Sequence, residues 1–299
     1  MQLDTFDSSN WNCILLHWLN AKFSAFFMEL KKQSDYEQYI RQDGLGEYYV
    51  VINQFTFHSV YQPIFDKHQR VIGMEALLRI HGADGVQIRP DIFLSNASID
   101  PYFRLCVEFL SRAMHIRNFA RHFAGTPIKL FLNVMPQTLL TLTKDMGFKD
   151  NGLLYKRLAD LGMTPSDVVF EVVEESCGDT DLLIKAVQLM RANGFIFAID
   201  DFGAQHSDIV RVQQLCPDII KIDRSYLLDY CAGDTFSIRS AVDLAANMGA
   251  KVIIEGVEEN NQLQAMRQLE LDYYQGFYLG KPSAIHHWTE YATCQCTVH

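Results

Sequence analysis

Several features that would place this chain in a common functional class are absent from its sequence. Its 299 residues carry a formal net charge of −10 and contain no block of lysine and arginine, which argues against binding bulk nucleic acid through its phosphates. The opening residues, MQLDTFDSSN, are acidic, whereas a signal peptide begins with basic residues. The apolar stretch at 11–27 is interrupted by His17, Asn20 and Lys22 and is too short to span a bilayer. We therefore expect a cytoplasmic protein without a membrane span.

The cysteines lack the pattern of a disulfide framework. There are seven of them, at positions 13, 106, 177, 216, 231, 294 and 296. An odd number scattered along a long chain is typical of free thiols in a reducing compartment. The tail at 291–299 contains Cys-Gln-Cys, but no further pair of cysteine or histidine ligands lies near it. We expect no metal site there.

The first 50 residues differ from the rest of the chain. Apolar and aromatic residues recur near helical spacing between positions 11 and 30, and a second short helical stretch, SDYEQYIRQ, follows before DGLGE. The pattern predicts an N-terminal helical extension over residues 1–50. It either packs on the main domain or offers a surface for dimerisation or for a partner protein.

From residue 57 onward, apolar runs alternate with helical segments. FHSVYQPIF and RVIGMEALLRI have the composition of strands and are joined by a short polar turn, DKHQ. Six further apolar runs follow, at 128–134, 168–174, 195–201, 218–223, 251–257 and 271–277. Strands that are apolar along their length and alternate with helices indicate a mostly parallel sheet with a covered outer face.

Eight such strands predict an α/β fold, a modified (β/α)8 TIM-like barrel over residues 51–290. The first two strands are joined by too few residues for a parallel crossover, so one of them should run antiparallel. An open, doubly wound sheet is the alternative arrangement of the same elements.

Polar residues recur where these strands end. They are Asn133, Glu171, Glu174, Asp200, Asp201, Lys221, Glu255 and Gln275, with Glu75 inside the second strand. Each alone has an ordinary explanation, such as a helix cap or a solvated side chain. Because the C-terminal ends of barrel strands form one rim, where catalytic residues lie, their joint placement predicts a functional site.

This expected rim contains carboxylates, amides and a lysine, but no cysteine or histidine. Hard oxygen donors suit Mg²⁺ or Mn²⁺ rather than Zn²⁺. The adjacent carboxylates of Asp200 and Asp201 repel each other unless cations lie between them. The pair therefore indicates two metal ions about 4 Å apart with one bridging aspartate, and a nearby lysine favours hydrolysis of a phosphoester.

The motifs of the chain resemble those of the EAL domain, the cyclic-di-GMP phosphodiesterase family. The Glu-Ala-Leu triplet corresponds to Glu75, Ala76 and Leu77 within YQPIFDKHQRVIGMEALLRI. The other motifs follow in order: LNV, FEVVEES, IDDFG, IKID, IEGVEE and QGFYLGKP. The resemblance covers residues 55 to 285, and seven ordered motifs make it specific.

The resemblance implies a reaction, the hydrolysis of one phosphodiester bond of cyclic-di-GMP to linear pGpG in bacterial signalling. It implies that one of two metal ions is held by Glu75, Asn133, Glu171 and Asp200. The second is then held by Asp200, Asp201 and Glu255. Lys221 and Gln275 would lie near the attacking water, and Glu174 would position the loop after the paired aspartates. Together with Glu255, which also binds metal, these three are the expected catalytic residues.

The resemblance also implies contacts with the substrate. Gln62 matches a position that contacts a guanine in the family. Glu75, Leu77 and Arg79 share one strand face by the period of two, which places Arg79 where its guanidinium can pair with a substrate phosphate. A homodimer and a separate regulatory protein are the expected protein partners.

Two departures from the family pattern leave alternatives open. Residues 204–208 read AQHSD where the family usually has threonine, glycine, tyrosine, serine and serine, and residues 81–127 match poorly. The chain could be a non-hydrolysing cyclic-di-GMP receptor, a protein-interaction module, or a barrel enzyme with another phosphate substrate. Degenerate EAL domains usually lose acids of the metal set, whereas every acid is present here, which favours the enzyme.

Overall fold

The computed structural model describes residues 30, 32–145, 153–173, 180–204 and 209–290. Four features expected from the sequence lie outside these ranges. They are the helical pattern at 11–29, Glu174, residues 205–208 of the altered loop, and the tail at 291–299.

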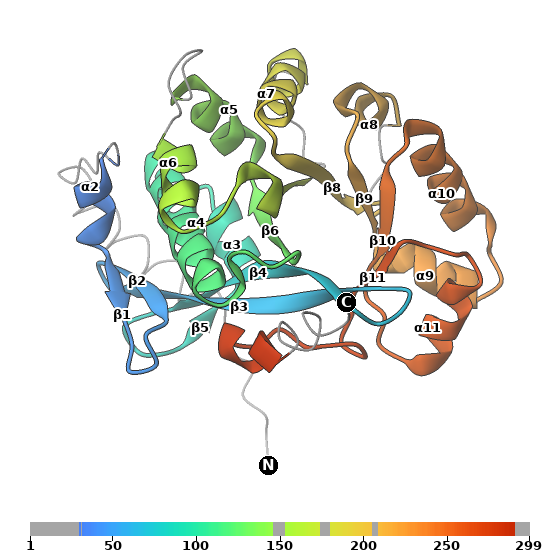
Figure 1. The fold of residues 1–299 in the computed structure, drawn as a ribbon, viewed down its shortest axis with the longest axis horizontal. Helices are drawn as coiled ribbons and strands as arrows, with labels where there is room; N and C mark the ends of the chain where they lie inside the picture. The colour runs from blue at the N-terminus through green and yellow to red at the C-terminus, as the bar shows by residue number, and fades with distance from the viewer. Residues whose placement is uncertain (1–29, 31, 146–152, 174–179, 205–208, 291–299) are drawn as a thin grey trace.

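A closed barrel of eight strands forms the centre of the molecule (Figure 1). Its strands are β3 (Phe55–Asp66), β4 (Val71–His81), β6 (Lys129–Val134), β7 (Val168–Val173), β8 (Ile196–Phe202), β9 (Ile219–Ile222), β10 (Lys251–Ile254) and β11 (Tyr273–Tyr274). The barrel closes because β3 pairs with both β4 and β11. The predicted barrel is confirmed, and the open sheet is wrong.

Strand β3 is the antiparallel member of this barrel. It runs antiparallel to β4 and β11, while the pairs from β4 through β6 to β11 are parallel. The tight turn after β3 fixes this direction: Asp66 Oδ1 accepts hydrogen bonds from the backbone N–H groups of His68 and Arg70, at 2.8 and 2.9 Å. So short a link permits only a hairpin.

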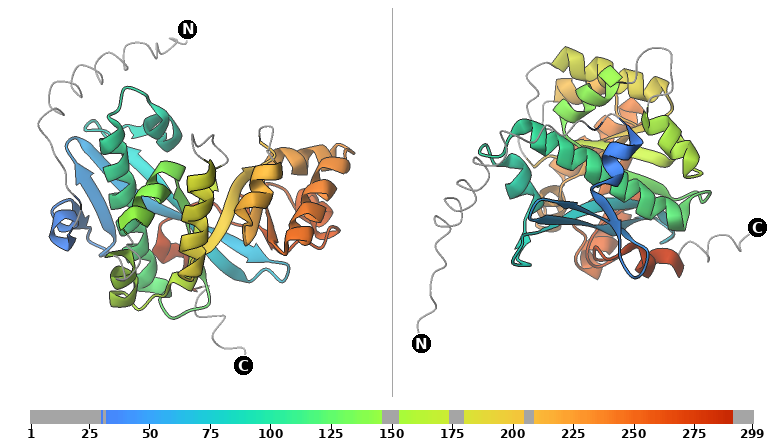
Figure 2. Two further views of the ribbon diagram at one scale, coloured as in Figure 1. Left: turned by 90° about the horizontal axis from the view of Figure 1, so that it is seen from above. Right: turned by 90° about the vertical axis from the view of Figure 1, so that its left-hand side faces the viewer.

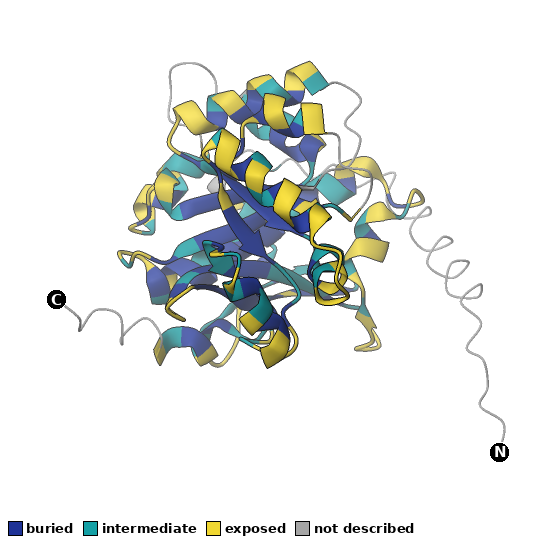
Figure 3. Ribbon diagram, turned by 90° about the vertical axis from the view of Figure 1, so that its right-hand side faces the viewer, coloured by how far each residue is buried: buried dark blue, intermediate teal, exposed yellow. Residues whose placement is uncertain are grey.

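Helices cover the outer face of the barrel (Figure 2). They include α4 (Pro101–Phe123), α5 (Pro136–Asp145), α6 (Leu153–Asp160), α7 (Thr180–Ala192), α8 (Ile209–Leu215), α9 (Arg224–Cys231), α10 (Phe236–Met248) and α11 (Asn260–Arg267). Figure 3 shows buried strands inside and helices whose exposed residues face outward. Among the described residues, no helix is long and apolar enough to cross a membrane.

The expected helical extension over residues 1–50 is wrong for residues 40–50. After the short helix α2 (Gln33–Glu37), strands β1 (Ile40–Gln42) and β2 (Tyr48–Ile52) form an antiparallel hairpin, and β2 pairs with β3. The turn between them is held by Asp43, whose Oδ1 accepts hydrogen bonds from the N–H groups of Leu45 and Glu47, each at 2.9 Å. Pairing with β3 thus outweighs the short helical pattern.

This hairpin lengthens the sheet beyond the barrel. The first half of β3, the second half of β4 and the short strand β5 (Gln87–Ile88) extend past the barrel rim with it. A second core lies between this sheet and the helices α3 (Pro90–Ser95) and α4, and its largest members are Phe55, Phe57, Phe93 and Phe103. The extension is therefore anchored to the barrel by strand pairing and by aromatic packing.

Candidate active site

An apolar layer fills the interior of the barrel. Its buried members are Ile64, Phe131, Val169, Ala198, Ile219 and Ile253, one from each of six strands. Gly73 supplies the corresponding place on β4, where a Cβ atom would lie 2.4 Å from the Phe131 ring. The ring fills the space that a larger side chain would take, so this layer is a solid floor.

A polar layer lies directly above this floor. Because side chains two residues apart face the same side of a strand, the next inward position on each strand follows from the floor residues. Those positions are Glu75, Asn133, Glu171, Asp200, Lys221, Glu255 and Gln275, together with Gln62 on the antiparallel strand β3. The eight strands therefore present eight polar side chains at one end of the barrel. Seven of them belong to the rim expected from the sequence, and Gln62 joins them.

Lys221 lies at the centre of this layer and is 1% exposed. Its Nζ is 2.7 Å from Glu171 Oε1 and from Asp200 Oδ1. It is 2.8 Å from Glu255 Oε1 and 3.5 Å from Glu75 Oε2. One ammonium group thus faces four carboxylates, and the cluster keeps an excess of negative charge.

Burial and mutual repulsion shift the ionisation of these groups. Burial raises the pKa of Glu171 well above its usual value and that of Glu255 to about 8, although the charge of Lys221 opposes both shifts. Burial alone would lower the pKa of Lys221, but the surrounding carboxylates outweigh it and raise that pKa well above its usual value. Without a further cation, the cluster holds protons at neutral pH.

Two amide side chains orient Glu75. Asn133 donates from Nδ2 to Glu75 Oε1 at 3.0 Å, and Gln275 donates from Nε2 to Glu75 Oε2 at 2.7 Å. Both carboxylate oxygens are thereby fixed, one on each side. Because the amide nitrogens of Asn133 and Gln275 donate to Glu75, their amide oxygens are left to bind a cation or a water molecule.

A break in the strand ladder explains how Asp200 and Asp201 can serve one site. In a regular strand, adjacent side chains point to opposite faces. The pairing of β8 with β9 shifts register between Ile199 and Phe202, and Asp201 has a positive φ of 57°. Such a bulge redirects the side chain of the extra residue, so that Asp201 can face the same side of the sheet as Asp200. Ligand oxygens of Asp200, Asp201 and Glu255 lie within 4.8 Å of one another.

Partial burial and the charge of Asp200 raise the pKa of Asp201 to about 6. A third aspartate, Asp223, also contributes to this shift, and the sequence did not single it out. Asp223 accepts a hydrogen bond from the N–H of Ser225 at 2.9 Å as the cap of α9. Its position in the IKID motif could have indicated a role in the site. In the sequence alone, however, an aspartate of the site looks the same as an aspartate that caps a helix.

The expected substrate-contacting residues lie along the β3–β4 hairpin. Gln62 is directly opposite Glu75 in the antiparallel register, and its Nε2 donates to the carbonyl of Gly280 at 3.1 Å. Leu77 and Arg79 continue along the same face of β4 beyond the rim, and Arg79 donates to the carbonyl of Leu78 at 2.9 Å. Arg79 is about 13 Å along the strand from Glu75, a span that suits an extended ligand.

Close backbone packing holds Gln275 in place. The next residue, Gly276, lies against Val257, where a Cβ atom would be 2.1 Å from the carbonyl oxygen and 2.2 Å from the nitrogen. The backbone of Gln275 pairs with Ile254 and Val257. Only glycine fits this approach.

We expect Gly276→Ala to lower the free energy of unfolding by at least about 3 kcal/mol, because the backbone at Val257 has to move. Gly44→Ala is the matched control, since a Cβ there meets nothing within 4 Å, and its effect should stay within about 0.5 kcal/mol. Chemical denaturation of both variants measures the difference. Equal stabilities would contradict the packing described at Val257.

The donor set of the rim fits divalent cations. Among the described residues, Glu171 Oε2 and the amide oxygen of Gln275 are buried and accept no hydrogen bond, while Glu171 Oε1 faces Lys221. Buried acceptors without donors are costly, and the uncompensated negative charge is best neutralised by ions that bind oxygen. The carboxylates from β4, β7 and β8 and after β10 are therefore suited to hold metal.

Comparison with known proteins identifies the family of this chain. Residues 48–282 match the model of the EAL domain. The chain is 32% identical over 239 residues to the probable cyclic di-GMP phosphodiesterase PdeG of Escherichia coli, and 28% identical over 232 residues to the biofilm architecture maintenance protein MbaA of Vibrio cholerae. Each match covers 77% of this chain, but only 45% and 28% of the length of those relatives.

Solved structures agree with the fold. The Bacillus subtilis YkuI protein, in complex with cyclic-di-GMP and calcium, is 26% identical with a TM-score of 0.66, over 80% of this chain and 60% of that one. Klebsiella pneumoniae BlrP1, in a manganese and cyclic-di-GMP complex, is 26% identical with a TM-score of 0.64, over 76% and 56% of the two chains. With its barrel, its ordered motifs and its polar rim, this chain belongs to the EAL domain family.

Proposed function

We propose that this chain is a metal-dependent phosphodiesterase that hydrolyses cyclic-di-GMP to linear pGpG. The observation that carries the proposal is the buried cluster in which Glu75, Glu171, Asp200 and Glu255 surround Lys221 within 3.5 Å. Related proteins named as probable cyclic di-GMP phosphodiesterases support the substrate. The complete acid set favours hydrolysis over a binding-only role.

Two divalent ions, Mg²⁺ or Mn²⁺, fit the residues of the rim. Glu75, Asn133, Glu171 and Asp200 would hold one ion, and Asp200, Asp201 and Glu255 the other. Bound ions of this kind lower the pKa of water and neutralise charge on phosphate oxygens. Calcium and manganese in the complexes of YkuI and BlrP1 support a divalent cation at such a site.

The remaining residues of the rim have roles that follow from their positions. Lys221 is held among the carboxylates and keeps its proton, so it acts as a fixed positive charge that orients water and offsets developing negative charge. Gln275 fixes Glu75 from the opposite side. Glu255, proposed both as a metal ligand and as a catalytic residue, lies 2.8 Å from Lys221 Nζ.

Substrate would bind over the rim, along the extended part of β4. Gln62, beside Glu75 in register, is suited to hydrogen bond a guanine edge, and Arg79 to pair with a phosphate. Leu77, between Glu75 and Arg79 on the same face of β4, provides an apolar surface for the ligand. Glu174 is proposed to position the loop after Asp201.

The cellular setting and assembly are also part of this proposal. A homodimer in the cytoplasm, acting with a separate regulatory protein, suits an EAL domain. Among the described residues, Cys216 and Cys231 form no disulfide, which supports a reducing compartment.

The direct test is incubation with cyclic-di-GMP and Mg²⁺ or Mn²⁺, followed by chromatography of the products. We expect linear pGpG to appear, chelator to stop its formation, and added Mg²⁺ or Mn²⁺ to restore it. Ca²⁺ should restore it poorly, because its longer bonds and looser geometry misplace the reacting groups. Full turnover in chelator would rule out the metal mechanism. Tight binding without product would instead assign the chain as a receptor.

A further inference from the structure

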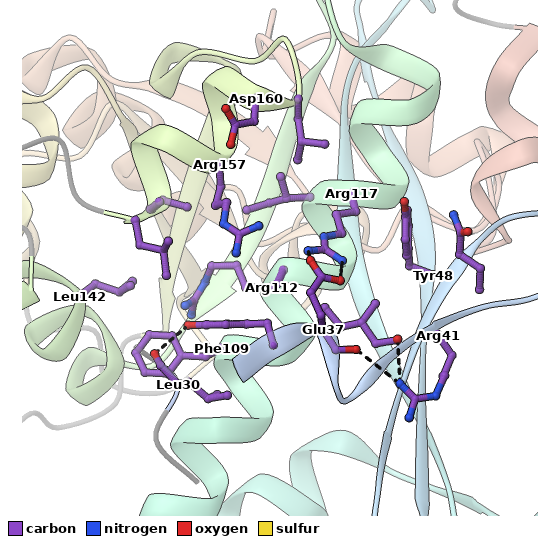
Figure 4. Close-up of a pocket in the computed structure, with 18 residues that line it drawn as sticks. Leu30, Glu37, Arg41, Tyr48, Phe109, Arg112, Arg117, Leu142, Arg157 and Asp160 are labelled. Atoms are coloured by element: carbon purple, nitrogen blue, oxygen red, sulfur yellow. Dashed lines mark hydrogen bonds and ion pairs between the residues drawn. The ribbon is translucent and has the colours of Figure 1, made fainter. Parts of the chain in front are cut away.

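A second candidate binding site lies outside the rim, between the N-terminal extension and the helices α4, α5 and α6. It is a cavity of about 980 Å³. Figure 4 shows its lining side chains, none of which belongs to the carboxylate cluster. Arg41, Arg112, Arg117 and Arg157 line it, against two acidic residues, Glu37 and Asp160. A net positive lining is unexpected in a chain with a net charge of −10.

Arg112 is the buried cation of this cavity. It is 5% exposed, and its guanidinium lies between the rings of Phe109 and Phe170, at 5.7 and 5.9 Å from their centroids. Among the described residues, its Nε and Nη1 have no hydrogen-bond acceptor. Its nearest carboxylate oxygen, on Glu108, is 3.7 Å from Nη2, too far for a hydrogen bond. Two buried donors therefore lack acceptors, which is costly unless a ligand supplies them.

Arg157 on α6 brings a second guanidinium to the same cavity (Figure 4). Partial burial lowers its pKa, and the charge of Arg117 lowers it further. Arg117 itself is bound by both oxygens of Glu37, at 2.5 and 3.0 Å, whereas Arg157 forms no ion pair with any described side chain. The carboxylates of Glu37 and Asp160 attract Arg157 only at longer range, so an anion in the cavity would give it a direct ion pair.

The rest of the lining is apolar. Phe109, Leu142, Leu153, Leu154 and Leu161 contribute to the wall. A cavity of about 300–1,000 Å³ with apolar walls and a few convergent polar groups is typical of small-molecule sites. The planar fork of arginine matches the two oxygens of a carboxylate or phosphate.

We propose that this cavity binds a small organic anion, with its phosphate or carboxylate group on Arg112 and Arg157 and its apolar or aromatic body against Phe109 and the leucines. The site is separate from the rim and requires no metal. The domain would then bind a small molecule other than its substrate at a site of its own.

A fluorescent aromatic anion, 8-anilinonaphthalene-1-sulfonate, tests the site in the full chain. We expect saturable binding to one site in wild type and about tenfold weaker binding in Arg157→Gln, the order expected for one lost charge-assisted hydrogen bond. Arg239→Gln is the matched control, since Arg239 is exposed on α10 outside the cavity. Its affinity for the probe should equal that of wild type.

A second variant keeps the test valid if Arg157→Gln does not fold. Leu153→Glu places a carboxylate at the exposed edge of the cavity, at the first residue of α6, where it is favourable for the helix. It should also weaken binding, at unchanged thermal stability. Competition by phenyl phosphate and by phenylacetate then distinguishes a phosphate from a carboxylate ligand. The proposal is overturned if wild type shows no saturable binding of the probe, or if both variants bind the probe as tightly as wild type does.

Discussion

Replacing Glu171 by glutamine is expected to lower the turnover of cyclic-di-GMP by about 10²–10³-fold, the usual cost of removing one buried electrostatic group from an active site. Glu171 is 0% exposed and lies 2.7 Å from Lys221 at the centre of the rim. Glutamine has nearly the same shape but carries no charge, so it weakens the hold on a divalent cation. Initial rates of pGpG formation at saturating Mn²⁺ measure the loss.

The same substitution should leave the metal-free fold intact. Burial raises the pKa of Glu171 well above its usual value, so its charge is costly in the folded chain, and glutamine keeps the shape of the side chain without that charge. Thermal unfolding in chelator should match that of wild type, while the stabilisation by Mn²⁺ should be smaller. Glu270→Gln, at an exposed carboxylate after α11, is the control and should keep full turnover. Unchanged turnover in Glu171→Gln would refute the site.

The barrel and its polar rim could be predicted because both follow from local periodicity. Apolar runs of strand length define the floor, and a period of two places the polar residues above it, as with Phe131 and Asn133 or Ile219 and Lys221. That one of the first two strands runs antiparallel was predictable because the short turn at Asp66 excludes a crossover, but which of the two it is was not.

Features that depend on pairing between distant strands could not be predicted. The hairpin of β1 and β2 forms because β3 offers an edge to pair with, which the helical spacing of residues 34–42 does not reveal. The positive φ of Asp201 depends on the register of β9, over 15 residues away. Similarly, Arg112 and Arg157 form no sequence motif. They line one cavity only because the fold places helices α4 and α6 beside it.

Lys221 was expected near the attacking water, and its contact with four carboxylates has a further consequence. Removing one partner of a buried charge cluster costs about 3–5 kcal/mol, because the remaining charges are left without compensation. We therefore expect Lys221→Met to lower the stability of the metal-free protein at pH 8 by about this amount. The melting temperature should fall by roughly 10 °C.

The loss should depend on pH in a defined direction. In wild type, the pKa of Glu255 is about 8 in the folded chain against an ordinary 4.5, and that of Asp201 is about 6 against 3.8. Between these values the folded state binds protons that the unfolded state does not, so stability falls as pH rises from about 4 to 8. Because Lys221 lowers both pKa values, its removal raises them further and steepens this fall.

The destabilisation of Lys221→Met should therefore be small at pH 5, where protonated carboxyls need no counter-charge, and largest at pH 8. Mn²⁺ should reverse much of it at pH 8, since divalent cations replace the missing charge. Lys251→Met is the matched control: Lys251 pairs with Asp272 at 2.8 Å but is 59% exposed, so its loss should cost less than about 1 kcal/mol at either pH. Thermal unfolding of both variants and wild type at pH 5 and 8, in chelator and in Mn²⁺, measures these differences. A pH-independent loss in Lys221→Met, or one that Mn²⁺ does not reduce, would show that Lys221 stabilises the barrel through packing and not as the counter-charge of the metal-binding carboxylates.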